Sequence, residues 1–476
     1  MKKNDIIENV EIEKLIFGWQ WLATAEDGRK IIITGWAIPR SKVTLRILKV
    51  HKNRFEAQIM AVTTRSPYER ELPTHWQIYG GCKWLAIPYK VQTEIKENQI
   101  KEAFHILKDK TESTQFHSIV ESPETEWYRN KVEFSWGKYI SAKEWVHDEF
   151  RFGFHAPGQF DRIINCTHCI LADDRVNEIF RSVDEYSRLS WLPTYDPKTG
   201  EGFWRHLVIR QSKKTGETMV IFSANTNYPH WSRKEEWDLR IFINTLTQKY
   251  NDIVSVYILY NTGRADIVTG EAILLHGKST ITEELLWNRF EIHPKSFFQT
   301  NSLWAEKLYT TTINLLDKKE SSTPSWILLD LYGWTGTIWI LLSQHFKKVY
   351  SVELVKEASE DGKRNALLNN IHNVEFINMK TEEWLPGFIE QKVNEPVTLI
   401  VDPPRDGMHP KATKDLLAFG SDIIMYVSCN PATLVRDLMI LLEENTYMIT
   451  DVTPVDMFPH THHIETVVRL EKIKKN

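Results

Sequence analysis

The last third of the chain alternates apolar strands with helices, and this pattern constrains the fold more than any other feature of the 476 residues. Apolar runs of buried-strand length lie at 326–331, 348–353, 398–402 and 423–428. A helical segment such as 356–369 separates each strand from the next, and this alternation is typical of a parallel, doubly wound sheet. We therefore predict an α/β protein with a Rossmann-like sheet in residues 291–476.

The preceding residues divide into two further predicted domains. Residues 1–63 contain short alternating strands and an Asp27-Gly28 hairpin signal, which together predict a small β-barrel of the oligonucleotide-binding type. Residues 64–290 mix strands and helices, which predicts a central α+β domain. Within it we expect a helix at 89–107, strands at 205–210 and 255–260, and a loop at 184–204.

Three polar signals follow predicted parallel strands, at the sheet edge where ligands of open α/β folds bind. The turn after the first strand reads Asp330-Leu-Tyr-Gly-Trp-Thr-Gly, and its small residues let backbone N–H groups approach a ligand. Glu353 ends the next strand, where a carboxylate can accept hydrogen bonds from ribose hydroxyls. Asp402 precedes two prolines that stiffen the exit of the third strand. Together these signals favour a nucleotide-like cofactor, although each alone is compatible with an ordinary turn.

The fourth strand ends at Cys429, just before a predicted helix at 432–442. A helix N-terminus lowers a thiol pKa, so Cys429 is a candidate nucleophile; the alternative is an inert buried cysteine. Further on, residues 456–465 hold three histidines and two acidic residues. This cluster is compatible with a metal site, with a carboxylate base beside the nucleophile, or with a polar loop.

Overall composition gives few functional clues. The net charge is −4, from 59 Lys+Arg and 63 Asp+Glu, and does not by itself indicate a nucleic-acid-binding protein. Only four cysteines occur, without the spacing of a secreted scaffold, which favours the reducing cytoplasm. No run of 18 apolar residues is present, so we expect no membrane-spanning helix.

The motifs together resemble those of the RNA 5-methyluridine (uracil-C5) methyltransferase family, whose members act on tRNA or 23S rRNA. The resemblance covers nearly the whole chain. Its specific segments, in order, are Ser-Phe-Phe-Gln-Thr-Asn at 296–301, Asp-Leu-Tyr at 330–332, Asp-Pro-Pro-Arg at 402–405, Ser-Cys-Asn-Pro at 428–431 and Phe-Pro-His-Thr at 458–461. The N-terminal strands resemble the RNA-binding TRAM module that many members carry.

The resemblance implies a class I methyltransferase domain, S-adenosylmethionine as cofactor and RNA as partner. We further expect the protein to be a monomer and to have no membrane partner. It implies that Cys429 adds to C6 of uracil, which activates C5, and that Glu465 removes the C5 proton. The target base would be flipped out of its stack to reach the thiol. The implied cofactor-contacting residues are Gln299, Tyr332, Glu353 and Asp402.

Some relatives hold an iron–sulfur cluster on four cysteines. Here two of the matching positions are Pro73 and Tyr79, and only Cys82 and Cys169 remain. Because such clusters need thiolate ligands, we predict no iron–sulfur cluster. A structural zinc site needs four ligands, and no second close pair accompanies Cys166 and Cys169, so we predict no metal site.

Tryptophan stands at several positions where this family pattern has glycine. These positions are Trp19, Trp21, Trp36, Trp191, Trp287, Trp304, Trp334 and Trp339. The chain has 20 Gly and 18 Trp, whereas average usage would give about 33 glycines. One hypothesis is that the gene comes from a lineage that reads the codon UGA as glycine. If the tryptophans are real, the indole at Trp334 would crowd the cofactor loop.

Several functional interpretations therefore remain open. We favour uridine-C5 methylation of 23S rRNA because of the TRAM-like strands, with tRNA as the alternative substrate. A non-catalytic RNA-binding relative, blocked by Trp334, is a second possibility. A third is methylation of an adenine amino group, which shares a Pro-Pro motif but needs no cysteine nucleophile.

Overall fold

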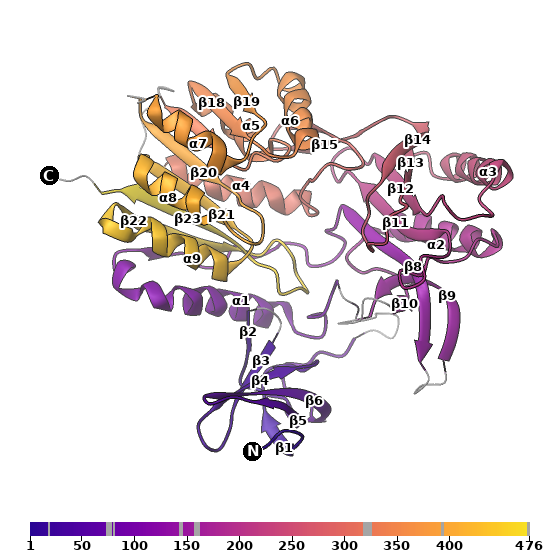
Figure 1. The fold of residues 1–476 in the computed structure, drawn as a ribbon, viewed down its shortest axis with the longest axis horizontal. Helices are drawn as coiled ribbons and strands as arrows, with labels where there is room; N and C mark the ends of the chain where they lie inside the picture. Colours follow the sequence, from indigo (N-terminus) through magenta and orange to yellow (C-terminus); the bar gives the residue numbers. More distant parts are fainter. Residues whose placement is uncertain are drawn as a thin grey trace.

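The computed structural model describes residues 1–17, 20–72, 79, 81–141, 146–156, 162–317, 326–391 and 395–473. Six strands near the N-terminus form a sheet in the order β1-β5-β6-β4-β3-β2, at the bottom of Figure 1. They are β1 (Ile6–Glu11), β2 (Lys14–Ile16), β3 (Gln20–Thr24), β4 (Lys30–Thr34), β5 (Lys42–Val50) and β6 (Arg54–Thr64). The predicted hairpin is confirmed: β3 and β4 pair antiparallel, and Gly28 between them has a φ of 82°.

The middle of the chain forms a seven-stranded sheet in the order β10-β9-β8-β11-β12-β13-β14. Its strands are β8 (Lys131–Ser141), β9 (Val146–His155), β10 (Ile163–Asn165), β11 (Trp204–Gln211), β12 (Thr218–Ala224), β13 (Ile253–Tyr260) and β14 (Glu271–Gly277). Helices α2 (Asp174–Leu189) and α3 (Arg233–Lys249) pack on this sheet, and side chains from both helices share its core.

The predicted loop at 184–204 is wrong in its first part, because α2 continues to Leu189. Val176, Ile179, Phe180 and Val183 recur at helical spacing and are buried against the sheet. Burial of this apolar stripe outweighs the weak local signals for a turn, so the helix continues through residue 184.

The C-terminal part forms an eight-stranded sheet in the order β19-β18-β17-β20-β21-β23-β22-β7. Its strands are β17 (Ile327–Asp330), β18 (Lys348–Val352), β19 (Val374–Ile377), β20 (Val397–Val401), β21 (Ile423–Ser428), β22 (Tyr447–Val455), β23 (Glu465–Lys472) and β7 (Gln115–Phe116). Strands β17 to β21 are parallel, whereas β23 is antiparallel to both β21 and β22. The predicted doubly wound α/β fold is confirmed.

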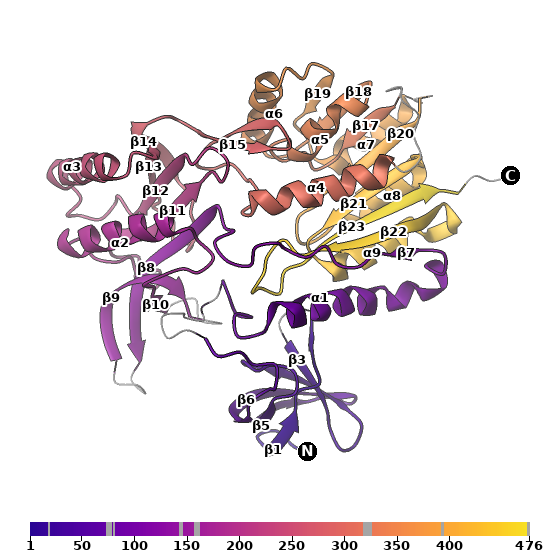
Figure 2. The same cartoon turned by 180° about the vertical axis from the view of Figure 1, so that it is seen from behind.

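Helices cover both faces of this sheet. They are α4 (Ser302–Asp317), α5 (Thr337–Leu342), α6 (Lys356–Leu368), α7 (Thr381–Glu390), α8 (Pro410–Phe419) and α9 (Pro431–Leu441), with 3₁₀ turns η2 (Ser343–His345) and η3 (Glu443–Asn445). Figure 1 shows α7, α8 and α9 on the near face, and Figure 2 shows α4 on the opposite face. Strand β21 is buried throughout, as expected for a central strand covered on both sides.

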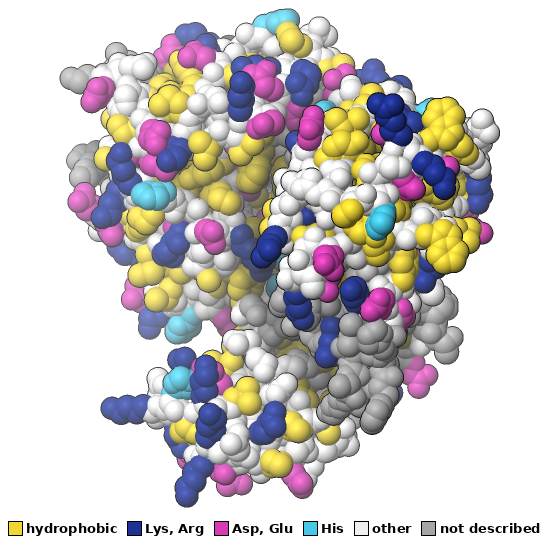
Figure 3. Space-filling model, turned by 45° about the vertical axis from the view of Figure 1, so that its right-hand side comes forward, with side chains coloured by type: hydrophobic (Ala, Val, Ile, Leu, Met, Phe, Trp, Pro, Cys, Tyr) yellow, Lys and Arg dark blue, Asp and Glu magenta, His cyan; other side chains and the backbone are white. Residues whose placement is uncertain are grey.

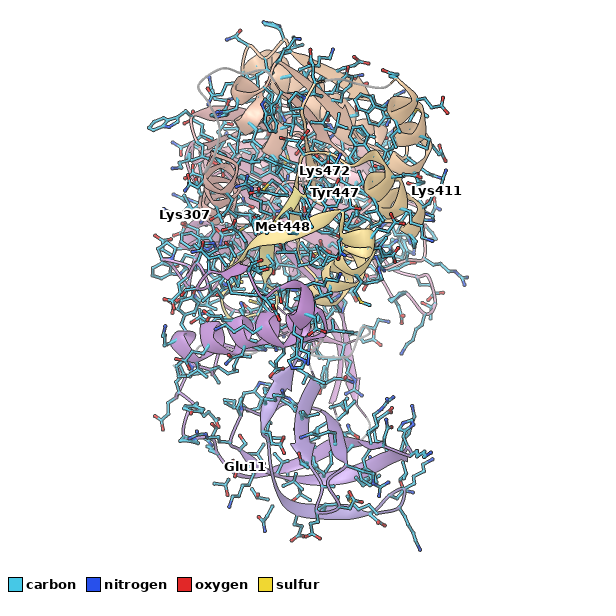
Figure 4. All side chains as sticks on the ribbon, turned by 90° about the vertical axis from the view of Figure 1, so that its left-hand side faces the viewer. Glu11, Lys307, Lys411, Tyr447, Met448 and Lys472 are labelled. Carbon is cyan, nitrogen blue, oxygen red and sulfur yellow. The ribbon has the colours of Figure 1, made fainter. Side chains whose placement is uncertain are left out.

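Part of the segment between the first two sheets packs against the C-terminal sheet. Helix α1 (Tyr89–Phe104) continues into the 3₁₀ turn η1 (His105–Lys110) and contacts α9, and β7 extends the sheet beyond β22. Figure 4 shows α1 between the N-terminal strands and β22, where Tyr447 lies beside Lys472 of β23. Residues far from the C-terminus therefore support the C-terminal sheet.

Two short strands, β15 (Ile281–Leu285) and β16 (Asn288–Ile292), form a hairpin between the middle and C-terminal sheets. The order of the parallel strands reverses around β17, which pairs with β18 on one side and β20 on the other. Loops after β17, β20 and β21 leave the same edge, where such sheets bind ligands. No helix among the described residues is long and apolar enough to cross a membrane.

Candidate functional site

A cavity of about 350 Å³ lies at the edge where the strand-end loops meet. Figure 3 shows that the molecule is hollowed between its C-terminal and middle parts, with hydrophobic side chains along the hollow. Four of the predicted site residues line the cavity: Gln299, Asp402, Cys429 and Glu465. The remaining lining residues are Arg129, Phe297, Thr300, Trp334, Pro403, Pro404, Arg405, Phe458 and His463.

Cys429 occupies the junction between β21 and α9. The side chain of Asn430 caps α9 by accepting a hydrogen bond from the Ala432 N–H, and Pro431 takes the first helical position, where it needs no partner. Asn430 also donates its side-chain N–H to the Arg405 carbonyl, 3.0 Å away. The two strand-end loops are thereby tied together with the half-buried thiol between them.

The prediction of a lowered thiol pKa at Cys429 is wrong for the protein without RNA. Burial, followed by the nearby carboxyl groups of Glu465 and Asp402, raises the Cys429 pKa to about 12, although Arg405 opposes this shift. The helix N-terminus does not outweigh these effects. The resting Cys429 side chain is therefore a thiol, and it would have to lose its proton to act as a nucleophile.

Several carboxyl groups at the strand ends have raised pKa values, and those of Glu465 and Asp402 line the cavity together with the thiol. Burial, followed by the nearby Asp402, raises the Glu465 pKa well above its ordinary value. Burial also raises the pKa of Asp402 to about 7 and that of Asp330, at the end of β17, to about 8. Titratable groups shifted in this direction and clustered in a cavity are typical of catalytic sites, because a carboxylate with a raised pKa is a stronger base.

The loop between β22 and β23 is held in place by α1. Lys96 donates to a carboxylate oxygen of Asp456 at 2.6 Å and to the Phe458 carbonyl at 3.1 Å, and both charged side chains are fully buried. Gln92 accepts a hydrogen bond from the His460 N–H at 2.7 Å. These contacts set the course of the loop that carries His463 and ends at Glu465.

The other predicted cofactor residues lie beside this cavity rather than in it. The Glu353 carboxylate accepts backbone N–H groups of Trp334 at 3.0 Å and Val355 at 2.6 Å. The backbone N–H of Tyr332 points to Asp330, but its side chain packs into the core on the α7–α9 face of the sheet. Gln299 lines the cavity, and its carbonyl accepts a hydrogen bond from Asn130.

The indole of Trp334 occupies the middle of this edge. Its N–H donates to the Asp402 carbonyl at 3.0 Å, and its ring lies 4.7 Å from the ring of Phe297. Trp334 and Phe297 also border a second cavity of about 690 Å³, which extends toward the start of α6. The two aromatic side chains therefore form a wall between the cavities.

The acidic residues at these strand ends would suit a ligand with cationic or hydroxyl groups, whereas the indole at 334 would crowd it. Glu353, Asp330 and Asp402 lie at the ends of neighbouring strands, where carboxylates can meet hydroxyl and cationic groups. Trp334 contacts two of these strand ends: its indole N–H donates to the Asp402 carbonyl, and its backbone N–H donates to the Glu353 carboxylate.

Sequence reasoning missed Arg129, Phe297 and His463 as lining residues. Arg129 precedes β8 and is held by a hydrogen bond from its own N–H to the Leu171 carbonyl. No local pattern marks this arginine, because a contact between the middle and C-terminal sheets brings it to the site. His463 belonged to the recognised histidine cluster, and burial lowers its pKa to about 3, so it is neutral.

The cysteines outside the cavity are buried. Burial raises the pKa of Cys82 to about 12, and Tyr79 and Cys169 are its neighbours. Among the described residues, no group of three or more His, Cys, Asp or Glu side chains could hold a metal ion. Pro73, one of the positions compared with the cluster-binding relatives, lies outside the described residues.

Comparison with known proteins identifies the family. Residues 278–473 match the family model described as tRNA (uracil-5-)-methyltransferase. A relative from Clostridium tetani, described as an RNA methyltransferase, is 37% identical over 97% of this chain and 97% of its own length. A second, from Clostridium acetobutylicum and described in the same way, is 36% identical over 99% of both chains. The chain belongs to the tRNA (uracil-5-)-methyltransferase family.

It is therefore an RNA methyltransferase, as the motifs indicated. The solved structure of the Pyrococcus abyssi tRNA (uracil-54, C5)-methyltransferase in complex with S-adenosyl-L-homocysteine has a TM-score of 0.72 and 26% identity to this chain. The match covers 98% of this chain and 100% of the archaeal one. The similarity thus extends over all three sheets.

Proposed function

We propose that this protein uses S-adenosylmethionine to methylate C5 of a uridine in RNA, with Cys429 as the covalent nucleophile and Glu465 as the base. The observation that carries the proposal is the shared cavity of Cys429, Glu465, Asp402 and Gln299. It places a thiol beside a buried carboxyl group at the ligand-binding edge of the sheet. S-adenosylmethionine, when bound, would supply the methyl group.

A covalent nucleophile is needed because C5 of uracil does not react readily with a methyl donor. C5 is a weak nucleophile, but when the Cys429 sulfur bonds to C6, the π electrons of the C5–C6 bond move toward O4. The resulting enolate-like ring is nucleophilic at C5 and can accept a methyl group there. As the sulfur–carbon bond forms, the thiol proton must pass to a neighbouring carboxylate or to water, because the resting pKa of Cys429 is about 12.

Product release requires a base on the same side of the site. Glu465 takes the proton from C5, the C5–C6 double bond forms again, and the sulfur–carbon bond breaks. Burial raises the pKa of Glu465, which makes its carboxylate a stronger base. His463, which stays neutral, and Arg129 line the same cavity, which would receive a flipped-out base.

The preferred substrate is a uridine of 23S rRNA. The short N-terminal strands support this choice through their resemblance to an RNA-binding module, and three sheets offer a large surface to a folded RNA. Transfer RNA is the second candidate, and the full-length similarity to an archaeal enzyme that acts on tRNA favours it. The same cavity would serve either RNA.

Mass mapping of 5-methyluridine in tRNA and rRNA, from cells with and without the gene, tests the proposal. We expect one or a few 5-methyluridines of 23S rRNA to disappear and to return when the gene is restored. Restoration with a Cys429→Ala variant is the matched control and should fail. Loss of methyluridine from tRNA alone would select the alternative substrate, and unchanged methyluridine in both RNAs would refute the proposal.

A further inference from the structure

Among the described residues, four tryptophans have a backbone conformation that favours glycine. Their φ angles are 55° at Trp127, 60° at Trp191, 73° at Trp287 and 45° at Trp334. Side chains with a Cβ rarely occupy this left-handed region, and asparagine is the usual exception because its short polar group bonds locally. A bulky indole has no such compensation. Four of these conformations on one residue type therefore need an explanation.

Trp287 occupies a turn position that is specific for glycine. Leu285 pairs with Asn288 across the β15–β16 hairpin, so Leu286 and Trp287 form its two-residue loop. Both have positive φ angles, 45° and 73°, as in a type I′ turn. The second position of such a turn strongly prefers glycine. The Trp287 side chain is fully exposed, so no packing interaction offsets the strain.

Trp191 occupies a second such position, at the end of a helix. Helix α2 ends at Leu189, Ser190 is its C-cap, and Trp191 follows in the left-handed conformation. This is the position at which helices commonly end with glycine, with a proline shortly afterwards, here Pro193. The Trp191 side chain is 94% exposed and therefore gains almost nothing from packing.

Trp334 occupies a third position that favours glycine, in the loop after β17. Gly333 and Gly336 flank it, and Gly336 has a φ of 91° with no room for a Cβ beside the Trp339 ring. The backbone N–H of Trp334 donates to the Glu353 carboxylate at 3.0 Å and holds the loop against the end of β18. Its indole, by contrast, separates the cavity of Cys429 from the larger cavity near α6.

We infer that positions 127, 191, 287 and 334 are glycine in the protein that its own cells make, encoded by UGA codons that those cells read as glycine. One cause then accounts for three unrelated features: part of the shortage of glycine, exposed indoles at turn positions, and an indole at the ligand edge of the sheet. At position 334 the change removes the indole half of the aromatic wall, leaves Phe297 in place and opens a connection between the two cavities. The effect of a glycine at position 334 on cofactor binding rests on the proposed function, whereas the identity of the four residues does not.

The other described tryptophans do not have a positive φ angle, and the inference does not extend to them. Trp204 is fully buried in β11 and stacks on Trp136 with ring centroids 5.0 Å apart. Trp21, Trp36, Trp304 and Trp339 have no left-handed φ, and Trp19 lies outside the described residues. Backbone conformation therefore distinguishes four positions from the rest, and the codons of the gene should show the same division.

The codons and the mass of the native protein test the inference without any measurement of catalysis. We expect UGA at codons 127, 191, 287 and 334, UGG at codon 204, and peptide masses from the source cells that contain glycine at the four positions. UGG codons, or tryptophan masses, at these positions would overturn the inference while leaving the proposed function standing. In that case the exposed indoles would have to be genuine surface groups of the enzyme.

Folding of the recombinant chain gives a second, independent test. We expect Trp287→Gly and Trp191→Gly each to raise the folding equilibrium constant about tenfold, because the left-handed conformation is costly for residues with a Cβ. Trp204→Gly is the matched control and should lower that constant, because it leaves a large core cavity. Loss of stability in Trp287→Gly and Trp191→Gly would contradict the inference.

The change at position 334 has its own readout. We expect Trp334→Gly to bind S-adenosyl-L-homocysteine in a calorimeter at least about tenfold more tightly than the tryptophan chain, because the ligand no longer competes with an indole. Cys429→Ala should leave this binding nearly unchanged. Equal binding by the Trp334 and glycine versions would refute the role assigned to position 334, even if the codon result held.

Discussion

Replacement of Lys96 by methionine should destabilise the protein strongly, because it leaves one buried charge alone. The Lys96 ammonium and the Asp456 carboxylate are 2.6 Å apart, and neither side chain is exposed. When the ammonium is removed, the carboxylate keeps the N–H of Phe458, at 3.1 Å, but loses its charged partner. Breaking a buried pair in this way costs about 3–5 kcal/mol. The Lys96→Met variant should therefore lose about that much unfolding free energy.

The matched variant removes both charges. Lys96→Met combined with Asp456→Asn leaves neutral groups of similar size, and the asparagine oxygen can still accept from Phe458. Because neutral replacement of a whole buried pair is often nearly neutral in stability, we expect the double variant to recover most of the loss. Lys101→Met, on the same helix, breaks only an exposed pair with Glu97 and should cost less than about 1 kcal/mol.

Urea unfolding, followed by near-ultraviolet circular dichroism, measures these differences in one cycle. The same loop carries Phe458 and ends at Glu465, so Lys96→Met should also slow reaction at Cys429, and the double variant should restore part of the rate. A Lys96→Met variant that loses less than about 1 kcal/mol, or a double variant no more stable than the single one, would refute the proposed support of the loop by α1.

Three further predictions concern the site. Glu465→Gln should accumulate a covalent complex with ordinary RNA, seen as a slow band in denaturing gels, because the C5 proton can no longer be removed; a band no stronger than that of the parent chain would contradict this. The rate of adduct formation at Cys429 should rise about tenfold per pH unit between about pH 6 and pH 9, because its thiol pKa of about 12 lies above this range; a pH-independent rate, measured by quenched gel assays, would contradict it. Burial lowers the His460 pKa from 6.5 to about 3, so the unfolded state binds the extra proton between these values. The free energy of unfolding should therefore decrease as the pH is lowered below 6.5, by up to about 1.4 kcal/mol per pH unit from this residue. Unfolding curves of the His460→Gln variant should show a smaller decrease over the same pH range.

The sequence allowed the sheet and its ligand edge to be predicted, because each parallel strand is an apolar run that ends in a polar motif. Asp402, Cys429 and Glu465 lie in the same cavity. Asp402 and Cys429 were expected to meet there, because they follow the neighbouring parallel strands β20 and β21. Glu465 reaches it from the antiparallel strand β23, whose place beside β21 no local pattern reveals. Here the family resemblance, rather than periodicity, supplied the residue.

What the sequence could not show depends on contacts between distant segments. Arg129 reaches the cavity from the middle sheet, and Lys96 of α1 reaches the loop between β22 and β23, 360 residues away in the sequence. The raised pKa of Cys429 reflects burial among carboxyl groups, which a helix start visible in the sequence does not reveal. The strain at Trp287 likewise appears only when the hairpin register and the φ angle are known.

A transcript containing 5-fluorouridine tests the central claim most directly, because fluorine at C5 offers Glu465 no proton to remove. We predict that the Trp334→Gly chain, incubated with this RNA and S-adenosylmethionine, yields a denaturation-resistant complex, and that digestion and mass spectrometry place the nucleotide on the peptide containing Cys429. The Cys429→Ala variant should give none. A bound nucleotide on any other residue, or no complex at all from a chain that binds both RNA and cofactor, would contradict the account.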